Sequence, residues 1–215
     1  MKTSNRRVKG FTLIEMVVVI AIIGALLGVF APAMSNYYWK SRVKAANAEA
    51  KMIYNAAQTE VQKYIAFDRA NPENPLKDYS SSKQSHLSGY YMITYSPSGI
   101  EIYSIDATSL SKSSGNLNIA GSSSTLQSAV TNIVTAVNNT VSDAETKCWA
   151  ICVNNYIVKS CIAADQTTTP YVGYYSTGRI TLPAERPTVT YSSWLTGNDA
   201  ENSLLGRARG YDNAS

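Results

Sequence analysis

The 215-residue sequence predicts an α+β protein in which a long N-terminal α-helix packs on a C-terminal antiparallel β-sheet domain with a short extra helix. Three observations predict this class. A long apolar run near the N-terminus continues into a segment with helical periodicity. Two later segments alternate aromatic and β-branched residues on either side of turn sequences, which is typical of hairpins. Between these hairpins lies one short amphipathic stretch.

The composition allows a buried core and argues against several kinds of site. Hydrophobic residues make up 45% of the chain and charged residues 16%. A single histidine, His86, and three cysteines exclude most His/Cys metal centres. The chain contains no P-loop, H-E-x-x-H, G-x-S-x-G or dinucleotide-binding motif. We therefore expect no catalytic residue, no cofactor, no metal and no enzymatic activity.

The net charge of +4 is confined to the first ten residues. Four basic side chains lie there, at Lys2, Arg6, Arg7 and Lys9, and without them the chain has 15 basic and 15 acidic residues. A chain cut after Gly10 is formally neutral. Nucleic-acid binding through a broad basic face is not predicted, because neutralising phosphates requires a positive surplus.

Residues Phe11 to Phe30 form an apolar run interrupted only by Thr12 and Glu15. At about 1.5 Å per residue this run can cross a hydrocarbon layer of about 30 Å. The basic residues before it would keep the N-terminus cytoplasmic. A secretory signal cleaved near Ala31-Pro32-Ala33 is an alternative, although the run exceeds the usual signal length. A plain signal anchor is another.

Glu15 is the unusual residue of this run. A carboxylate within a membrane span is costly and normally has a partner or a function. We expect an isolated helix in lipid to gain nothing from a buried carboxylate. If the chain were cut between Gly10 and Phe11, the new α-amine would lie one helical turn away, and an amine beside a carboxylate relieves the desolvation of both groups.

The segment Lys9-Gly10-Phe11-Thr12-Leu13-Ile14-Glu15-Met16 resembles the type IV prepilin signal, and the resemblance extends over residues 6 to 66. It implies cleavage after Gly10 by a membrane-embedded prepilin peptidase and N-methylation of Phe11. It also implies that Glu15 pairs with a neighbouring subunit's N-terminus during assembly. Pro32 falls where many family members have a helix-bending proline.

The resemblance implies a structural subunit of a type IV pilus-like filament, with other pilins, the peptidase/N-methyltransferase and a pilus assembly platform as partners. The subunit would cross the inner or cytoplasmic membrane once before assembly and become extracellular afterwards. A pseudopilin of a type II secretion or DNA-uptake machine shares these features and is the alternative function. A membrane-tethered enzyme is a third class, but it lacks a catalytic constellation.

The helical pattern continues beyond the apolar run as one apolar stripe at three- and four-residue steps. The stripe comprises Trp39, Val43, Ala46, Ala50, Ile53, Ala57, Val61 and Tyr64. A proline-containing segment from Asn71 ends the helix. We divide the chain into a leader (1–10), the transmembrane half (11–35) and amphipathic half (36–70) of the helix, a β-sheet domain (71–185) and an irregular tail (186–215).

Within the globular part, residues 90–95 and 100–105 read as a hairpin about Ser96-Pro97-Ser98-Gly99, and residues 107–124 as a surface loop. A short amphipathic helix follows, with its apolar face at Leu126, Val130, Ile133, Val134 and Val137. Residues 171–175 and 179–182 are predicted to form further β-strand structure. In the tail, Trp194 and Leu195 are candidates for residues that dock the tail on the rest of the domain. His86 reads as a surface residue, and Asn138-Asn139-Thr140 is a weak glycosylation sequon.

A second hairpin is predicted about an Asn154-Asn155 turn, because asparagine tolerates the positive φ of a two-residue turn. In that register Cys148 faces Cys161 in a non-hydrogen-bonded pair, which has Cα atoms about 4.5 Å apart. The predicted core side carries Trp149, Ile151, Val153, Tyr156 and Val158. Two states stay open: a Cys148–Cys161 disulfide with Cys152 free or paired between chains, and three reduced thiols.

Overall fold

We describe the protein from a computed structural model, in residues 10–70, 89–105, 124–169, 171–176, 190–196 and 204, without the side chains at 32, 33, 65–70, 124 and 125. The chain divides into two compact units, Met1–Ser41 and Arg42–Ser215. The elements are α1 (Leu13–Ala70), β1 (Tyr90–Ser96), β2 (Gly99–Ser104), α2 (Ser124–Thr140), the 3-10 turn η1 (Ala144–Thr146), β3 (Cys148–Asn154), β4 (Ile157–Ala164), β5 (Gly173–Ser176) and α3 (Tyr191–Thr196).

Helix α1 confirms the long N-terminal helix, and its assignment is continuous through Pro32. Six of the eight stripe positions are buried, namely Trp39, Val43, Ala50, Ile53, Ala57 and Val61, and Ala46 and Tyr64 are half-buried. The periodicity of the amphipathic half therefore predicted its buried face.

The sheet has five antiparallel strands in the order β2-β1-β3-β4-β5. Its first hairpin is confirmed, since Ser96 pairs with Gly99 across a loop made by Pro97 and Ser98. Helix α2 is also confirmed, and all five residues of its predicted apolar face are buried. Together with α1 these elements form the predicted α+β fold.

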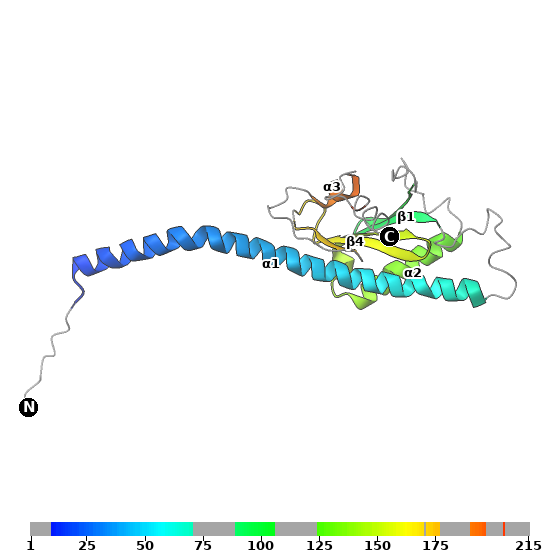
Figure 1. Cartoon of the computed structure of the whole chain (residues 1–215), viewed down its shortest axis with the longest axis horizontal. Coiled ribbons are helices and arrows are strands. Elements are labelled where there is room, and N and C mark those ends of the chain that lie inside the picture. Colours follow the sequence, from blue (N-terminus) through cyan, green and yellow to red (C-terminus); the bar gives the residue numbers. More distant parts are fainter. Residues whose placement is uncertain are drawn as a thin grey trace, which may run out of the picture. The chain divides into compact units, whose positions relative to one another are not determined.

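The sheet of the second unit is buried on both faces (Figure 1). On one face, Ile93, Trp149 and Ile151 pack in a core with the amphipathic part of α1 and with α2. On the other face, Met92 and Ile162 lie in a second core with side chains from α3. Alternation along each strand supplies both cores, because successive side chains of a strand point to opposite faces.

Two amide side chains of α1 bind the sheet, one at the edge strand β5 and one at the β3–β4 hairpin. Asn47 Oδ1 accepts a hydrogen bond from the Tyr174 N–H at 2.8 Å, so α1 satisfies a donor of the edge strand β5. Beside it, a Cβ on Gly173 would lie 2.0 Å from the Ala46 carbonyl oxygen, which means that only glycine permits this close approach. Gln58 accepts from the Val158 N–H at 2.7 Å and donates to the Tyr156 carbonyl at 3.4 Å.

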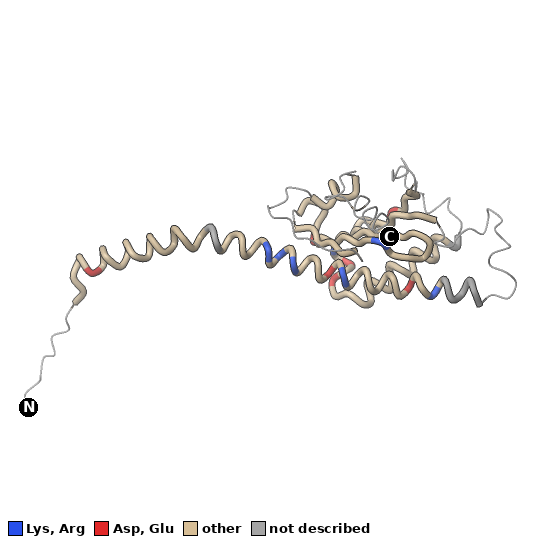
Figure 2. The backbone as a smooth tube through the Cα atoms, in the orientation of Figure 1, with Lys and Arg blue, Asp and Glu red and all other residues tan. Residues whose placement is uncertain are grey.

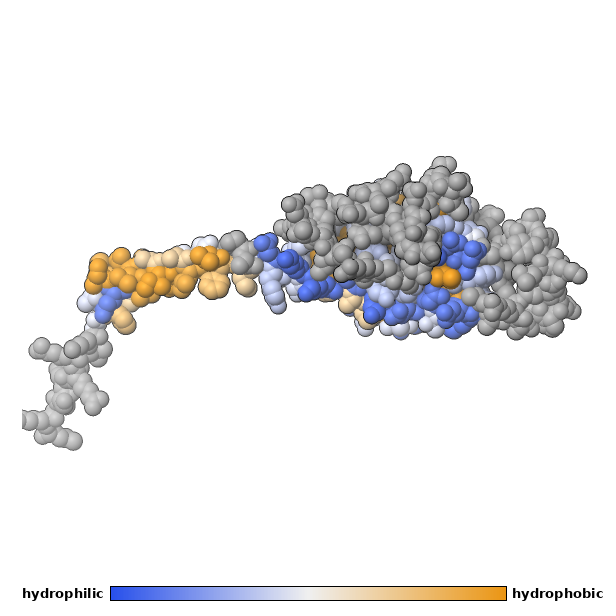
Figure 3. Space-filling model, viewed as in Figure 1, coloured by the Kyte–Doolittle hydropathy of each residue, from blue (hydrophilic) through white to orange (hydrophobic). Residues whose placement is uncertain are grey.

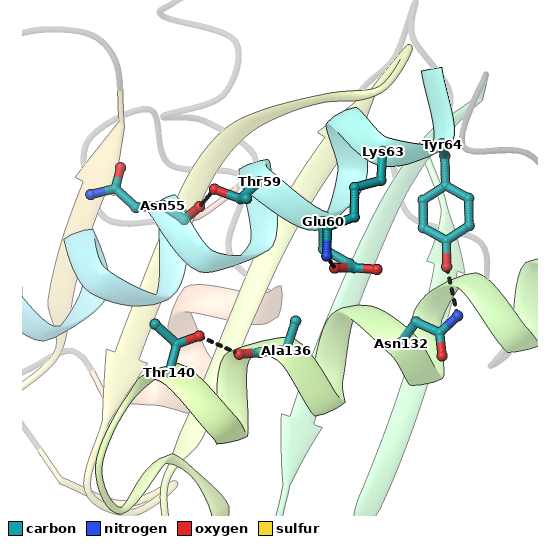
Figure 4. A network of polar contacts seen from close by, with 8 residues as sticks. All are labelled: Asn55, Thr59, Glu60, Lys63, Tyr64, Asn132, Ala136 and Thr140. Atoms are coloured by element: carbon teal, nitrogen blue, oxygen red, sulfur yellow. Dashed lines mark hydrogen bonds and ion pairs between the residues drawn. The ribbon is translucent and has the colours of Figure 1, made fainter. Parts of the chain in front are cut away.

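A side-chain hydrogen bond joins α1 to α2, and further polar contacts lie along each helix beside it (Figure 4). The Asn132 amide donates to the Tyr64 hydroxyl at 2.9 Å, while Glu60 pairs with Lys63 along α1. The hydroxyls of Thr59 and Thr140 donate to carbonyls one turn earlier in their own helices. These hydroxyls therefore find acceptors within their own helices and do not link the two helices.

The predicted pairing of Cys148 with Cys161 is wrong. Strand β3 pairs Cys148 with Ala164 and Ile151 with Cys161, so the register differs from the prediction by three residues. The turn lies one residue later than predicted, at Asn155 (φ 47°) and Tyr156 (φ 64°), which accounts for two residues of the shift. An irregularity in the β3–β4 register beside Val153 accounts for the third.

An odd shift exchanges the two faces of a strand, which separates the two thiols. Cys148 lies in the core beneath α3, whereas Cys161 lies in the core beneath α1 and α2. All three cysteines are free and buried, including Cys152, which the alternative between-chain disulfide would need at the surface. Four of the five residues predicted for the core side, Trp149, Ile151, Val153 and Val158, do lie beneath α1, and Tyr156 packs against them half-buried.

The C-terminal part contains structure that the prediction of an irregular tail did not include. Helix α3 lies in it, and its Trp194 ring stacks on Tyr174 with centroids 5.8 Å apart. Trp194 is therefore confirmed as a docking residue, and Leu195 packs half-buried against the same core. The predictions for the leader residues 1–9, His86, the loop at 107–123, the strand at 179–182 and the last residues lie outside the described residues.

Candidate assembly segment

Gly10 and Phe11 precede the helix in an exposed, non-helical segment. The Phe11 side chain is 78% exposed. A Cβ added to Gly10 would meet no atom within 4 Å, so nothing in the described part of the chain requires glycine at this position. An irregular, exposed backbone is accessible to a peptidase. A requirement for Gly10 would therefore come from the enzyme that binds it.

Thr12 and Glu15 form a reciprocal cap at the start of α1. Glu15 Oε2 accepts hydrogen bonds from the Thr12 N–H at 2.8 Å and from the Thr12 hydroxyl at 2.7 Å. The Glu15 N–H donates to the Thr12 Oγ1 at 3.4 Å. This arrangement is a capping box, in which a threonine and a glutamate three residues later satisfy helical donors that lack a partner.

The capping box gives Glu15 a local role that the sequence prediction did not include. Before any other subunit is present, the carboxylate already has two donors from Thr12. The T-x-x-E spacing ahead of an apolar run is a readable signal for such a box, and it was not used in the prediction. Glu15 must therefore give up, or share, these hydrogen bonds if it is to bind another subunit.

From Leu13 to Met34 the described side chains of α1 are exposed and almost all apolar (Figure 3). Leu13 is 82% exposed and Val29 73%. Glu15 lies at the start of this surface, and no further charged residue precedes Lys40. In Figure 2 the described part of the tube is accordingly tan between the red segment at the start of α1 and the blue segments that follow. Among the described residues, α1 is the one helix long and apolar enough to cross a membrane, and its apolar stretch is not buried.

Two glycines within this surface, Gly24 and Gly28, lie one helical turn apart. Glycine inside a helix costs about 1 kcal/mol relative to alanine. A Cβ at either position would meet no atom within 4 Å, so packing within the chain does not require them. The G-x-x-x-G spacing is typical of helices that approach each other closely in membranes. The sequence prediction missed this signal, although it is readable.

The described residues contain no group of three His, Cys, Asp or Glu side chains that could hold a metal ion. The residues predicted to act in cleavage and assembly are Gly10, Phe11 and Glu15. They lie within a span of six residues at the N-terminal end of α1. Pro32 lies further along α1, within the helix.

Comparisons with known proteins bear on this segment. Residues 5–31 match the family model described as a prokaryotic N-terminal methylation motif. The chain carries a prepilin-type N-terminal motif. It is also homologous to two curated proteins of Neisseria gonorrhoeae, both called type IV major pilin protein PilE1, with 34% identity over 88 residues.

That alignment covers 41% of this chain and 51% or 47% of the relatives, so the chain spans about half the length of the curated relatives it matches. No solved structure gives a significant match. The long N-terminal helix followed by a five-stranded antiparallel sheet is consistent with the α+β fold of a type IV pilin. A prepilin motif on a long apolar helix fits a membrane-anchored pilin that is later extracellular.

Proposed function

We propose that this chain is the structural subunit of a type IV pilus-like surface filament, assembled by helix bundling after a prepilin peptidase removes residues 1–10. The observation that carries the proposal is the exposed apolar surface of α1 from Leu13 to Met34. A surface of this kind needs either lipid or other helices around it. Lipid covers it before assembly, and the helices of neighbouring subunits cover it in the filament.

The N-terminal residues have separate roles in this cycle. Cleavage between Gly10 and Phe11 creates the mature N-terminus, which is then N-methylated. Glu15 exchanges the Thr12 donors of its own chain for the Phe11 amine of a neighbour. This pair sets the axial position of the incoming subunit, because a misplaced subunit would leave both charges unpaired in an apolar bundle. Pro32 bends the helix where bundled subunits separate, and Gly24 and Gly28 allow close approach.

The proposed partners follow from these steps. They are further copies of the chain and other pilins, the prepilin peptidase/N-methyltransferase, the pilus assembly platform and the membrane. Before assembly the chain crosses the inner or cytoplasmic membrane once, with its N-terminus in the cytoplasm. The subunit acts by assembly and not as an enzyme, which the homology to a structural pilin supports.

Imaging of sheared surface filaments from cells with and without this chain tests the proposal. We expect filaments that contain the chain, that are lost on its deletion and that return on complementation. Unchanged filaments that lack the chain, together with a defect in protein secretion or DNA uptake, would instead identify it as a pseudopilin.

A further inference from the structure

The end of the apolar surface of α1 has an unusual composition. Tyr37 and Tyr38 are 72% and 55% exposed, in the turn that follows Met34. Exposed cationic residues follow at Lys40, Arg42 and Lys44, and no acidic residue lies between Glu15 and Glu49. Tyr37, Lys40 and Lys44 are spaced by three and four residues, so they share one face of the helix.

These residue types match the chemistry of a lipid headgroup region. Tyrosine is enriched at membrane–water interfaces, because its ring is apolar and its hydroxyl is polar. Lysine extends its apolar stem along the hydrocarbon and places its ammonium group among the phosphates. Each cation near an anionic surface strengthens attachment by about fivefold.

The spacing along α1 fits the thickness of a bilayer. Tyr37 lies 22 positions after Glu15, which corresponds to about 33 Å of helix. The hydrocarbon layer is about 30 Å thick. When the tyrosines lie at one interface, Glu15 and its capping box therefore reach the other interface and avoid the centre of the bilayer, where a carboxylate is most costly.

We propose that Tyr37, Tyr38, Lys40 and Lys44 form an interfacial anchor that binds the anionic phosphate headgroups of the extracytoplasmic leaflet and fixes the depth of α1 in the membrane. The inference rests on the proposed function, since it concerns the membrane-stored subunit before assembly. The anchor opposes outward sliding of α1, which is the first movement that extraction into a filament requires.

The test uses the full chain with Ser35→Cys, reconstituted in vesicles of phosphatidylcholine with or without a one-third share of phosphatidylglycerol. The native cysteines are buried, so a membrane-impermeant maleimide reports on residue 35. We expect labelling to be at least about tenfold slower on the anionic vesicles, because two lysines hold the helix inward. Lys40→Gln with Lys44→Gln should abolish this difference, and Tyr37→Ala with Tyr38→Ala should speed labelling on both vesicles.

The matched control is Lys51→Gln with Lys63→Gln, on the same helix. Lys51 lies about 10 Å along the helix beyond Lys44, the outermost lysine of the anchor, which is further than the Debye length of about 8 Å at physiological ionic strength. This control should keep the full dependence on anionic lipid. The proposal is overturned if the control loses as much as the anchor variant, or if anionic lipid does not slow labelling of the parent chain. It is also overturned if the anchor substitutions impair filaments while leaving labelling unchanged, since the face would then contact a neighbouring subunit.

Vesicle labelling does not depend on filament formation. A chain that forms no surface filaments but keeps the lipid response would contradict the proposed function and leave the anchor standing. A chain that assembles but shows no lipid response would contradict the anchor alone.

Discussion

At the residue scale, Glu15 has two possible sets of donors. In the single chain it accepts from the Thr12 N–H and hydroxyl, and in the proposed filament it pairs with a neighbour's Phe11 amine. Caps of this type contribute about 1 kcal/mol, whereas removing one partner of a buried ion pair costs about 3–5 kcal/mol, because the other charge is left unpaired. Loss of the Glu15 carboxylate should therefore harm the filament more than loss of the cap.

Glu15→Ala should leave processing, membrane insertion and the globular fold intact, while lowering the ratio of sheared-filament to membrane-pool protein by more than about tenfold. Glu15→Gln should recover part of this ratio, because it keeps an acceptor but loses the charge. Thr12→Val is the matched control: it removes the capping hydroxyl, keeps the carboxylate and should assemble nearly as the parent chain does. Equal losses in Thr12→Val and Glu15→Ala would show that capping, and not pairing between subunits, is what matters.

Burial of the three cysteines lowers the reactivity of their thiols. Desolvation raises the pKa of the Cys152 thiol to about 12, and burial also raises the pKa of Cys161. Thiols of this kind are unreactive, since the thiolate is the nucleophile. Alkylation of the native chain should therefore add no label at any cysteine, and alkylation after unfolding without reductant should add three, as read by intact mass. A single label after unfolding would demonstrate a disulfide.

Tyr103 provides a test of pH dependence. Desolvation, with the hydrogen bond to Glu101 and its negative charge, raises the Tyr103 pKa from its ordinary value near 10 to about 12. A raised folded pKa contributes stability that is fully present below pH 10 and is lost as the pH rises towards 12. Tyr103→Phe should therefore lose less stability than the parent chain between about pH 9 and pH 11, measured by urea unfolding in detergent micelles. An equal loss in both proteins would contradict this.

At the element scale, helix α1 determines where the β3–β4 turn lies. Gln58 binds the Val158 N–H and the Tyr156 carbonyl, and the Asn155 N–H donates to the Gly89 carbonyl. These contacts hold a turn at Asn155-Tyr156, although tyrosine is uncommon at positive φ. Local sequence favoured Asn154-Asn155, so the register of this hairpin was not predictable from the hairpin alone.

Gln58→Ala should lower the free energy of unfolding by about 1–3 kcal/mol, because it leaves a buried backbone donor unsatisfied. Gln62→Ala, an exposed glutamine one turn later on α1, should change it by less than about 0.5 kcal/mol. Thermal unfolding in detergent micelles, followed by near-ultraviolet circular dichroism, measures both. Similar effects of the two substitutions would mean that Gln58 does not hold the turn.

At the scale of the whole molecule, the structural features that could be predicted are those that depend on a local sequence pattern. The stripe of α1, the first hairpin and the apolar face of α2 follow from periodicity and turn chemistry. The predicted cysteine pairing was wrong because the position of the β3–β4 turn depends on contacts with Gln58 and Gly89, which are distant in sequence. Helix α3 was missed since six residues, Tyr191–Thr196, are too few to show a helical period. Its buried residues Tyr191 and Trp194 pack in the same core as Tyr174, far away in sequence.

In the proposed filament, Phe11 is the mature N-terminus of a subunit whose apolar helix is buried among neighbouring helices. Intact-mass analysis of this chain recovered from sheared surface filaments is the sharpest test of that arrangement. We expect a mass lacking residues 1–10 and carrying one added methyl group, located at Phe11 by fragmentation. A mature N-terminus near Met34, or a chain that retains residues 1–10 in the filament fraction, would rule the arrangement out.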